Sequence, residues 1–136
     1  MLANFDAPAR DECAAQRNVS NTPQQALTLL NDPTFVEAAR LFAARLLATK
    51  QDASEDERIE NAFQLAVARS PKPKEAQSLK EFLGSQREQF AADPSAAAKL
   101  LKIGQTPPSS GNALELAAWT SLCRVLLNLQ EVITRY

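Results

Sequence analysis

The sequence predicts an all-α fold. Three observations support this prediction: the composition, the placing of the prolines and the spacing of the apolar residues. Ala, Leu, Gln, Glu and Arg are abundant in the 136 residues, whereas glycine occurs three times and β-branched residues are scattered. Prolines at positions 23, 33, 73 and 94 each precede a segment whose apolar residues recur with helical spacing. We expect five or six short-to-medium helices in an orthogonal or antiparallel bundle.

The first helix is expected over residues 23–30. Thr22 and Gln25 have the spacing of a capping box, in which each side chain accepts from the other residue's backbone N–H. Pro23 suits the first helical position because its missing N–H would have no partner there. The apolar residues of this segment, among them Leu27, are expected to face inward.

The second helix is expected to begin where Asp32 can cap a turn opened by Pro33. Its apolar residues recur at intervals of three and four, which defines one inward face. Glu37, Arg40 and Arg45 fall opposite that face, so we expect them in solvent.

The third and fourth helices have clear beginnings. Ser54 and Glu57 form a second capping box, and Pro71 is expected to stop that helix, because the residue before a proline leaves the helical region. A longer helix starts at Pro73. Gly84 inside it lowers helix propensity by about 1 kcal/mol relative to alanine.

The last third of the chain predicts a short helix, a loop and a long helix. The short helix starts at Asp93 and ends at Gly104, a residue type common just past helix ends. Residues 105–112 hold two prolines, two serines and a glycine, so they predict a loop. Asn112 can cap the last helix, which is expected to run to about Thr134.

The core is expected to form from the large apolar residues on the inward faces of these helices. They are Leu27, Leu30, Phe35, Phe42, Leu46, Phe63, Leu79, Phe82, Leu126 and Leu129.

The chain divides into two regions. Residues 1–21 lack a helical face and contain Pro8, so they predict an extended or irregular arm, whereas residues 22–136 predict one helical domain. The arm is either a loose tail or a segment that belongs against a missing part of a larger domain. We favour the second interpretation.

Composition and charge narrow the class of protein. The net charge is −1 with both signs interspersed, so no basic stripe predicts a nucleic-acid partner. No apolar run approaches the length of a membrane span, and no signal peptide is recognisable, so the chain as written is expected to be cytoplasmic. Cys13 and Cys123 form no metal-binding or redox pattern, and a disulfide between them is not favoured.

The residue types exclude most catalytic schemes. There is no histidine to activate a serine or to complete an ordinary zinc set, and no glycine-rich phosphate loop. We therefore predict no catalytic residues, no cofactor and no metal, and we lean against an enzyme. The oligomeric state cannot be read from the sequence.

One set of residues is a candidate interaction surface. Carboxylates and arginines of the arm could form an acid–base or calcium site, neighbouring amides could bind a carbohydrate, and a tryptophan could stack on a ligand. Ion pairing with arginine, helix capping and core packing are the favoured interpretations of the same residues. The set is Asp6, Arg10, Arg17, Asn18, Asn21, Gln24 and Trp119.

Four segments carry a resemblance to a known family. They read FDAPARDEC, RNVSNTPQQALTLLNDPTFVEAARLFAARLL, AFQLAVARSPKPKEAQSL and AAWTSLCRVLLNLQEVITRY. The chain resembles the C-terminal domain of unknown function of large planctomycete proteins, many of which also carry a cytochrome c-like domain. The two most specific pieces are NTPQQALTLLNDPTFVEAA and RVLLNLQEVITR.

The resemblance implies that this chain is the C-terminal part of a longer protein. Family members have a secretory signal, a haem-binding module and a second uncharacterised domain, none of which is in this sequence, so Met1 is expected to mark a truncated gene or an excised piece. Full-length relatives are expected outside the cytoplasm. The family supplies no catalytic residues to carry over.

Two functions are therefore considered. The first is a non-catalytic helical module that packs against other domains or protein partners. The alternative is a fragment of an extracytoplasmic enzyme, an oxidoreductase or a carbohydrate-active protein, whose site lies at the junction with missing domains.

Overall fold

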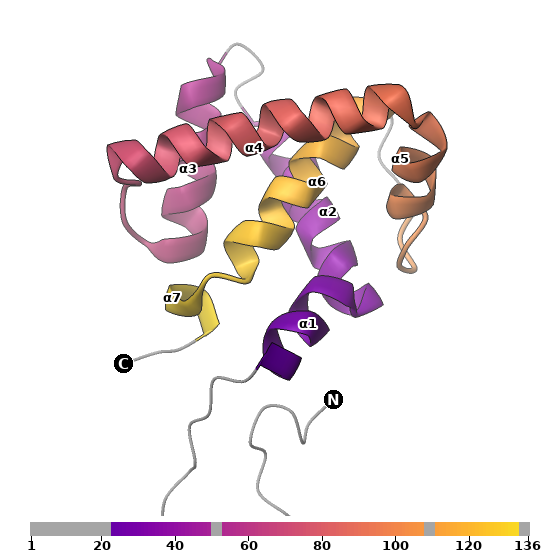
Figure 1. Cartoon of the computed structure of the whole chain (residues 1–136), viewed down its shortest axis with the longest axis horizontal. Coiled ribbons are helices and arrows are strands. Elements are labelled where there is room, and N and C mark those ends of the chain that lie inside the picture. Colours follow the sequence, from indigo (N-terminus) through magenta and orange to yellow (C-terminus); the bar gives the residue numbers. More distant parts are fainter. Residues whose placement is uncertain (1–22, 50–52, 108–110, 134–136) are drawn as a thin grey trace, which may run out of the picture.

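The computed structural model describes residues 23–49, 53–107 and 111–133 (Figure 1). Within these ranges 81% of the residues are helical and no strand occurs, which confirms the predicted all-α class. None of the described helices combines the length and hydrophobicity needed to cross a bilayer. The described helices are α1 (Pro23–Asn31), α2 (Pro33–Ala48), α3 (Glu55–Val67), α4 (Pro73–Ala92), α5 (Pro94–Leu101), α6 (Ala113–Leu127) and α7 (Gln130–Ile133).

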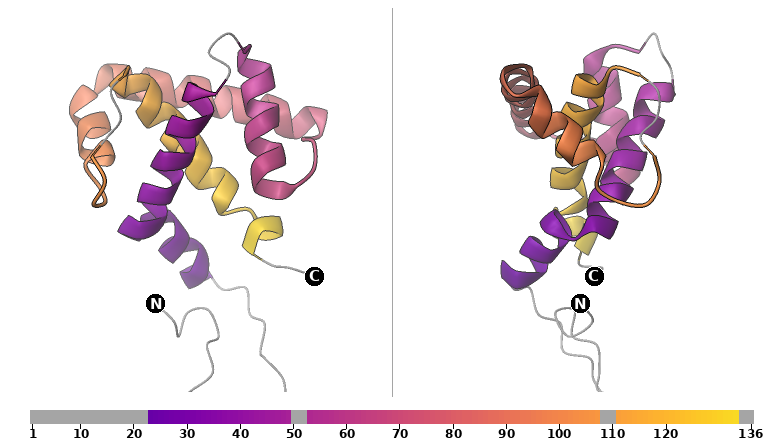
Figure 2. Two further views of the ribbon diagram at one scale, coloured as in Figure 1. Left: turned by 180° about the vertical axis from the view of Figure 1, so that it is seen from behind. Right: turned by 90° about the vertical axis from the view of Figure 1, so that its right-hand side faces the viewer.

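Helix α6 lies at the centre of the fold. It contacts each of the other six described helices, and α2 and α4 contribute most to its surroundings. Figure 1 shows α4 crossing in front of α6, and Figure 2, seen from behind, brings α2 to the front. All eight residues 116–123 are buried, so α6 has no solvated side along two turns.

Four helix starts confirm the predicted caps. The side chains of Asp32, Asp93 and Asn112 accept from backbone N–H groups two residues ahead at 2.9–3.1 Å. Ser54 forms the predicted capping box, in which its hydroxyl accepts from the Glu57 N–H and its own N–H donates to the Glu57 carboxylate. The predicted Thr22 cap lies outside the described residues.

The predicted core is mostly confirmed, with one clear error. Leu46, Phe63, Leu79 and Leu126 are buried in the central cluster, and Phe42, Phe82 and Leu129 pack against it. Leu30 and Phe35 are half-buried. The prediction for Leu27 is wrong, because its side chain is 58% exposed on α1.

The predicted last helix is too long. Helix α6 ends at Leu127, and Asn128 adopts φ −99° and ψ 4°, outside the helical region. Asparagine is a poor helix former because its side chain competes for backbone hydrogen bonds. The chain then turns into the short α7, which packs against α3 as well as α6, and Thr134 lies outside the described residues.

Two other helices end earlier than predicted. Helix α3 stops before Ala68, which has φ 61°, so the turn precedes Pro71 by three residues. Helix α5 ends at Leu101, and Gly104 lies in the following loop with φ 104°.

A clamp on that loop explains why Gly104 is needed. The Glu37 carboxylate of α2 accepts from the backbone N–H groups of Gln105 (3.0 Å) and Thr106 (2.7 Å). The Arg40 guanidinium donates to the Thr106 carbonyl at 2.6 Å and lies 3.6 Å from Glu37. We call Glu37 and Arg40, with the loop that they hold, the α2 clamp.

The α2 clamp corrects two sequence predictions. Arg40 is only 1% exposed and Glu37 is half-buried, although both were expected in solvent. The helical pattern of α2 is amphipathic, but the loop between α5 and α6 covers its polar face. The Thr106 carbonyl and the Glu37 carboxylate both partner the Nη2 end of Arg40, whereas its buried Nε has no hydrogen-bond partner among the described residues.

We predict opposite effects for two glycine substitutions. Gly104→Ala would place a Cβ 2.5 Å from the Glu37 Cδ on a backbone with positive φ, so it should destabilise the fold by about 1–3 kcal/mol. Gly84→Ala in α4 meets nothing within 4 Å and should stabilise by roughly 0.5–1 kcal/mol. Urea unfolding of both variants measures the two changes. Equal effects in both would contradict the clamp geometry.

We also predict an acid-dependent contribution from Glu37. Hydrogen bonds from the Thr106 side chain and from the backbone N–H groups of Gln105 and Thr106 lower its pKa to about 2. A carboxylate whose pKa is lower in the folded state stabilises the fold above its ordinary pKa, here 4.5, and loses that contribution as pH falls towards 2.

Glu37→Gln should therefore reduce the unfolding free energy at pH 7, and the difference from the wild type should shrink between pH 4.5 and pH 2. Urea titrations at several pH values check this. Glu88→Gln, at an exposed position on α4, is the control and should not reproduce the trend.

Candidate functional site

The predicted interaction surface is only partly visible in the described residues. Gln24 is exposed on α1, and Trp119 is fully buried in α6, where its ring offers no face to an outside ligand. The described ranges therefore do not bring these two residues together as one exposed surface. Asp6, Arg10, Arg17, Asn18 and Asn21 lie outside them.

Trp119 belongs to a polar network that joins three helices. Its Nε1 donates to the Glu115 carboxylate at 2.8 Å. Arg87 of α4 donates twice to Glu115, at 2.6 and 2.9 Å, and once to Glu55 at the start of α3. The hydrogen bonds from Arg87 lower the pKa of Glu115, so that carboxylate stays ionised and is occupied as an acceptor. The network fixes α3, α4 and α6 against one another.

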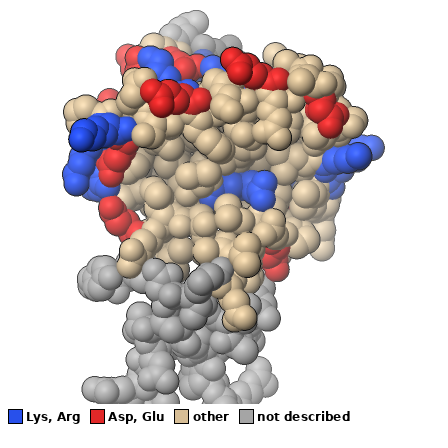
Figure 3. All heavy atoms as spheres, viewed as in Figure 1, with Lys and Arg blue, Asp and Glu red and all other residues tan. Residues whose placement is uncertain are grey.

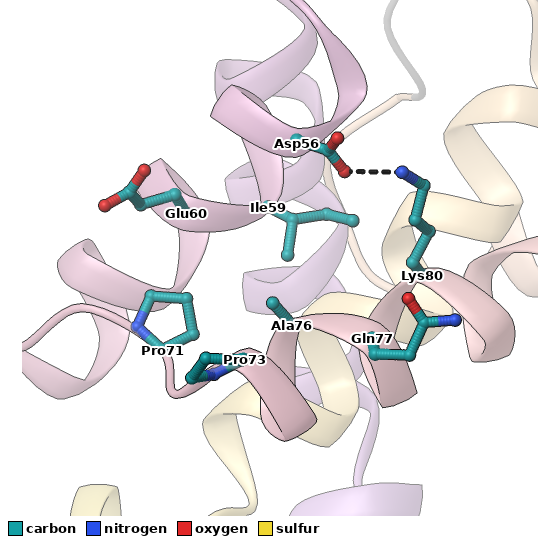
Figure 4. Close-up of a pocket in the computed structure, with 8 residues that line it drawn as sticks. All are labelled: Asp56, Ile59, Glu60, Pro71, Pro73, Ala76, Gln77 and Lys80. Atoms are coloured by element: carbon teal, nitrogen blue, oxygen red, sulfur yellow. Dashed lines mark hydrogen bonds and ion pairs between the residues drawn. The ribbon is translucent and has the colours of Figure 1, made fainter.

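A solvent-open hollow of about 340 Å³ lies between α3 and α4 (Figure 4). We call it the α3–α4 hollow. Its volume is at the small end for ligand pockets, which suits a side chain better than a large cofactor. Its lining residues are Asp56, Ile59, Glu60, Pro71, Pro73, Ala76, Gln77 and Lys80.

Aliphatic and polar side chains together line the α3–α4 hollow, and its edges are charged. Ile59 and Ala76 approach each other from the two helices (Figure 4). Asp56 and Lys80 close one end with an ion pair of 2.8 Å, and the hydrogen bond that Lys80 donates to Asp56 raises the pKa of Lys80. The Glu60 carboxylate is at the edge, and its donors in the described ranges are neutral.

A second hollow, of about 310 Å³, lies between α3, α4 and α7. We call it the α7 hollow. Arg69 lies 4.8 Å above the Phe63 ring on its floor and bonds to Glu75 and Glu131 at its rim, in each case at 2.8–2.9 Å. Hydrogen bonds from Arg69 and from the backbone N–H of Lys72 lower the pKa of Glu75 to about 2. The guanidinium is saturated by these two carboxylates and is not free to bind an anion.

The described side chains do not form a recognisable catalytic set. No group of three or more metal-ligating residues occurs in the described ranges. Cys123, the thiol that these ranges contain, is buried in α6, and burial raises its pKa, so the reactive thiolate is disfavoured. Its predicted partner in the disfavoured disulfide, Cys13, lies outside the described residues.

Sequence reasoning missed the charged residues that organise these hollows. Glu75 could have been found, because it lies three residues after Lys72 and accepts from the Lys72 N–H at 2.7 Å in a capping arrangement. Arg69 could not, because it also pairs with Glu131, which lies 62 residues away in the sequence.

Charged and uncharged side chains occupy different areas of the surface shown in Figure 3. On this face, viewed as in Figure 1, most Lys, Arg, Asp and Glu side chains gather around the edges, and the middle is largely free of them apart from one basic patch. The face therefore offers broad uncharged areas rather than a field of one sign.

Comparison with known families gives one match. Residues 1–83 match the family PSD1, described as a protein of unknown function (DUF1553). The chain belongs to this family. No curated protein and no solved structure matches the chain.

The extent of the PSD1 match differs from that of the sequence resemblance. It includes the segment NTPQQALTLLNDPTFVEAA and helices α1 to α3, and it ends within α4. The closing segment RVLLNLQEVITR lies beyond the matched residues. Membership in PSD1 gives no activity, because the family description assigns none.

We predict that Cys123 reacts only when the fold opens. In a Cys13→Ser variant, the remaining thiol should react with an aromatic disulfide reagent far more slowly in buffer than in urea, because it is fully buried and its pKa is raised. Absorbance of the released thiolate measures both rates. Similar rates in the two solvents would show that α6 is accessible.

Proposed function

We propose that this PSD1 chain is a non-catalytic helical module that packs against another protein surface, either a further domain of a longer protein or a partner chain. The observation that carries the proposal is α1, which leaves apolar side chains in water. The planctomycete-type multidomain setting implied by the sequence resemblance is consistent with this role.

Helix α1 has the composition of a contact surface. None of its nine residues is charged, and none of its described side chains is fully buried. Leu27 is 58% exposed, and Ala26, Leu29 and Leu30 are half-buried. Gln24 and Asn31 are exposed polar residues of α1, but no charged side chain accompanies them, and an uncharged surface helix with an exposed leucine favours a partner that covers it.

The position of α1 also supports docking. It packs on α2 and α6, and the Arg124 guanidinium of α6 donates to the Leu30 carbonyl near its C-terminus. A cation at the C-terminal end of a helix stabilises the unpaired carbonyls there. The helix is thus held at one end while its outer side remains available.

The charged clusters favour a structural role. Glu115, Glu75 and Glu37 are each occupied by an arginine or by backbone N–H groups, so their carboxylates serve the fold. The alternative, a fragment of an extracytoplasmic enzyme, depends on residues of the arm that lie outside the described ranges. It therefore stays a prediction.

We predict that Leu27→Asn weakens partner binding without unfolding the module. A photoactivatable amino acid at position 27, introduced in cells that make the protein, would cross-link to the neighbouring chain and so identify it. The identified partner is then purified. Removing an exposed leucine from an interface should weaken binding about 10-fold or more, because each 1.4 kcal/mol changes the constant tenfold. Titration calorimetry measures the constant.

The matched control is Leu65→Asn, because Leu65 is 53% exposed on α3 and distant in sequence from α1. It should leave binding unchanged, and both variants should keep the wild-type unfolding midpoint. Equal weakening by the two substitutions, or none by Leu27→Asn, would contradict docking through α1.

A further inference from the structure

We propose that the α3–α4 hollow is a receptor for a basic side chain, a lysine or arginine, presented by a partner protein. The aliphatic stem would lie on the aliphatic side chains of the lining, and the charged end would meet Glu60. This site is separate from α1, so it stands or falls independently of docking through Leu27.

The shape and lining of the hollow match such a side chain. Pro71, Pro73 and Ala76 supply aliphatic surface without a hydrogen-bonding side chain, and Ile59, which is only 2% exposed, adds little to it. Lysine and arginine bury their methylene stems on such surfaces while the charged end stays near water. The volume of about 340 Å³ and the open mouth suit one inserted side chain.

The charge of the lining favours a cation. Asp56 and Glu60 bring two negative charges and Lys80 brings one positive charge, which leaves the lining with a net charge of −1. Glu60 accepts from the Ser70 hydroxyl at 3.3 Å and from the Gln64 amide at 3.4 Å, both neutral donors. Within the described residues no cation pairs with Glu60, so its charge is available to a partner.

The hollow already contains an example of this recognition. The Lys80 ammonium lies 2.8 Å from Asp56, and the two side chains are 45% and 72% exposed. Asp56 and Glu60 are four residues apart on α3, so they lie on one face of that helix. A second ammonium entering beside Glu60 would meet the same kind of partner one turn away.

The experiment uses two probes that differ in charge. N-acetyl-lysine methylamide and N-acetyl-norleucine methylamide share an apolar stem, but only the first has an ammonium group. Each is titrated into the isotopically labelled full chain while the backbone amide shifts of Ile59, Ala76 and Gln77 are followed. We expect saturable shifts at these amides with the lysine probe, with a dissociation constant on the order of millimolar, and weaker binding of norleucine.

Substitution of the two flanking charges sharpens the test. Glu60→Gln should weaken lysine binding about 2- to 5-fold, as expected for an exposed ion pair, whereas Glu88→Gln outside the hollow should leave it unchanged. Lys80→Gln should strengthen binding, because it removes the positive charge that lines the hollow and occupies Asp56.

Four results would overturn the proposal. They are the absence of shifts at the hollow, shifts spread over the whole surface, equal affinity for the two probes, and an effect of Glu60→Gln no larger than that of Glu88→Gln. Because Glu60 is exposed, the circular dichroism of Glu60→Gln should match that of the wild type.

Discussion

The complete burial of α6 is the constraint on which the other helices depend. Trp119, Leu122 and Leu126 are fully buried, and their spacing of three and four residues puts them on one face of α6. Small residues lie between them, and Ala39 and Ala43 of α2 are fully buried as well. Small side chains allow two helix axes to approach closely, so α2 and α4 can enclose α6 from opposite sides.

Two arginines connect this apolar centre to the loop after α5 and to the C-terminal end of α1. Arg40 donates to the carbonyl of Thr106, and Arg124 donates to the carbonyl of Leu30. Both act across long stretches of sequence, between residues 66 and 94 positions apart. A charged hydrogen bond to a backbone carbonyl is stronger than a neutral one, so each arginine holds a segment that has few apolar contacts of its own.

The sequence predicted the local features of this fold well. Proline placing and capping residues such as Asp32 and Ser54 depend on neighbours within one helical turn, so they can be recognised without tertiary structure. Helical spacing likewise predicted most of the core. These signals cover the class, the helix starts and the order of the elements.

The errors share a physical cause. Burial of Arg40 and exposure of Leu27 are both decided by which elements pack together, and helical spacing does not contain that information. The α7 hollow could not be predicted for the same reason, since Arg69 finds its partner Glu131 on α7, far away in the sequence. Spacing shows that a helix has an apolar side but not whether another element covers its polar side.

The residues that match PSD1 do not include α6, so the matched region differs from the region that folds as a unit. The PSD1 match ends at residue 83, whereas the helix that fills the centre begins at Ala113. If the chain were cut at that boundary, α2 would lose the surface that Val36 and Leu46 pack into. Helix α4 would be interrupted at Leu83. Residues 1–83 alone would therefore lack the helix that the other helices surround. A soluble fragment of this protein has to include α6, which lies beyond the family match.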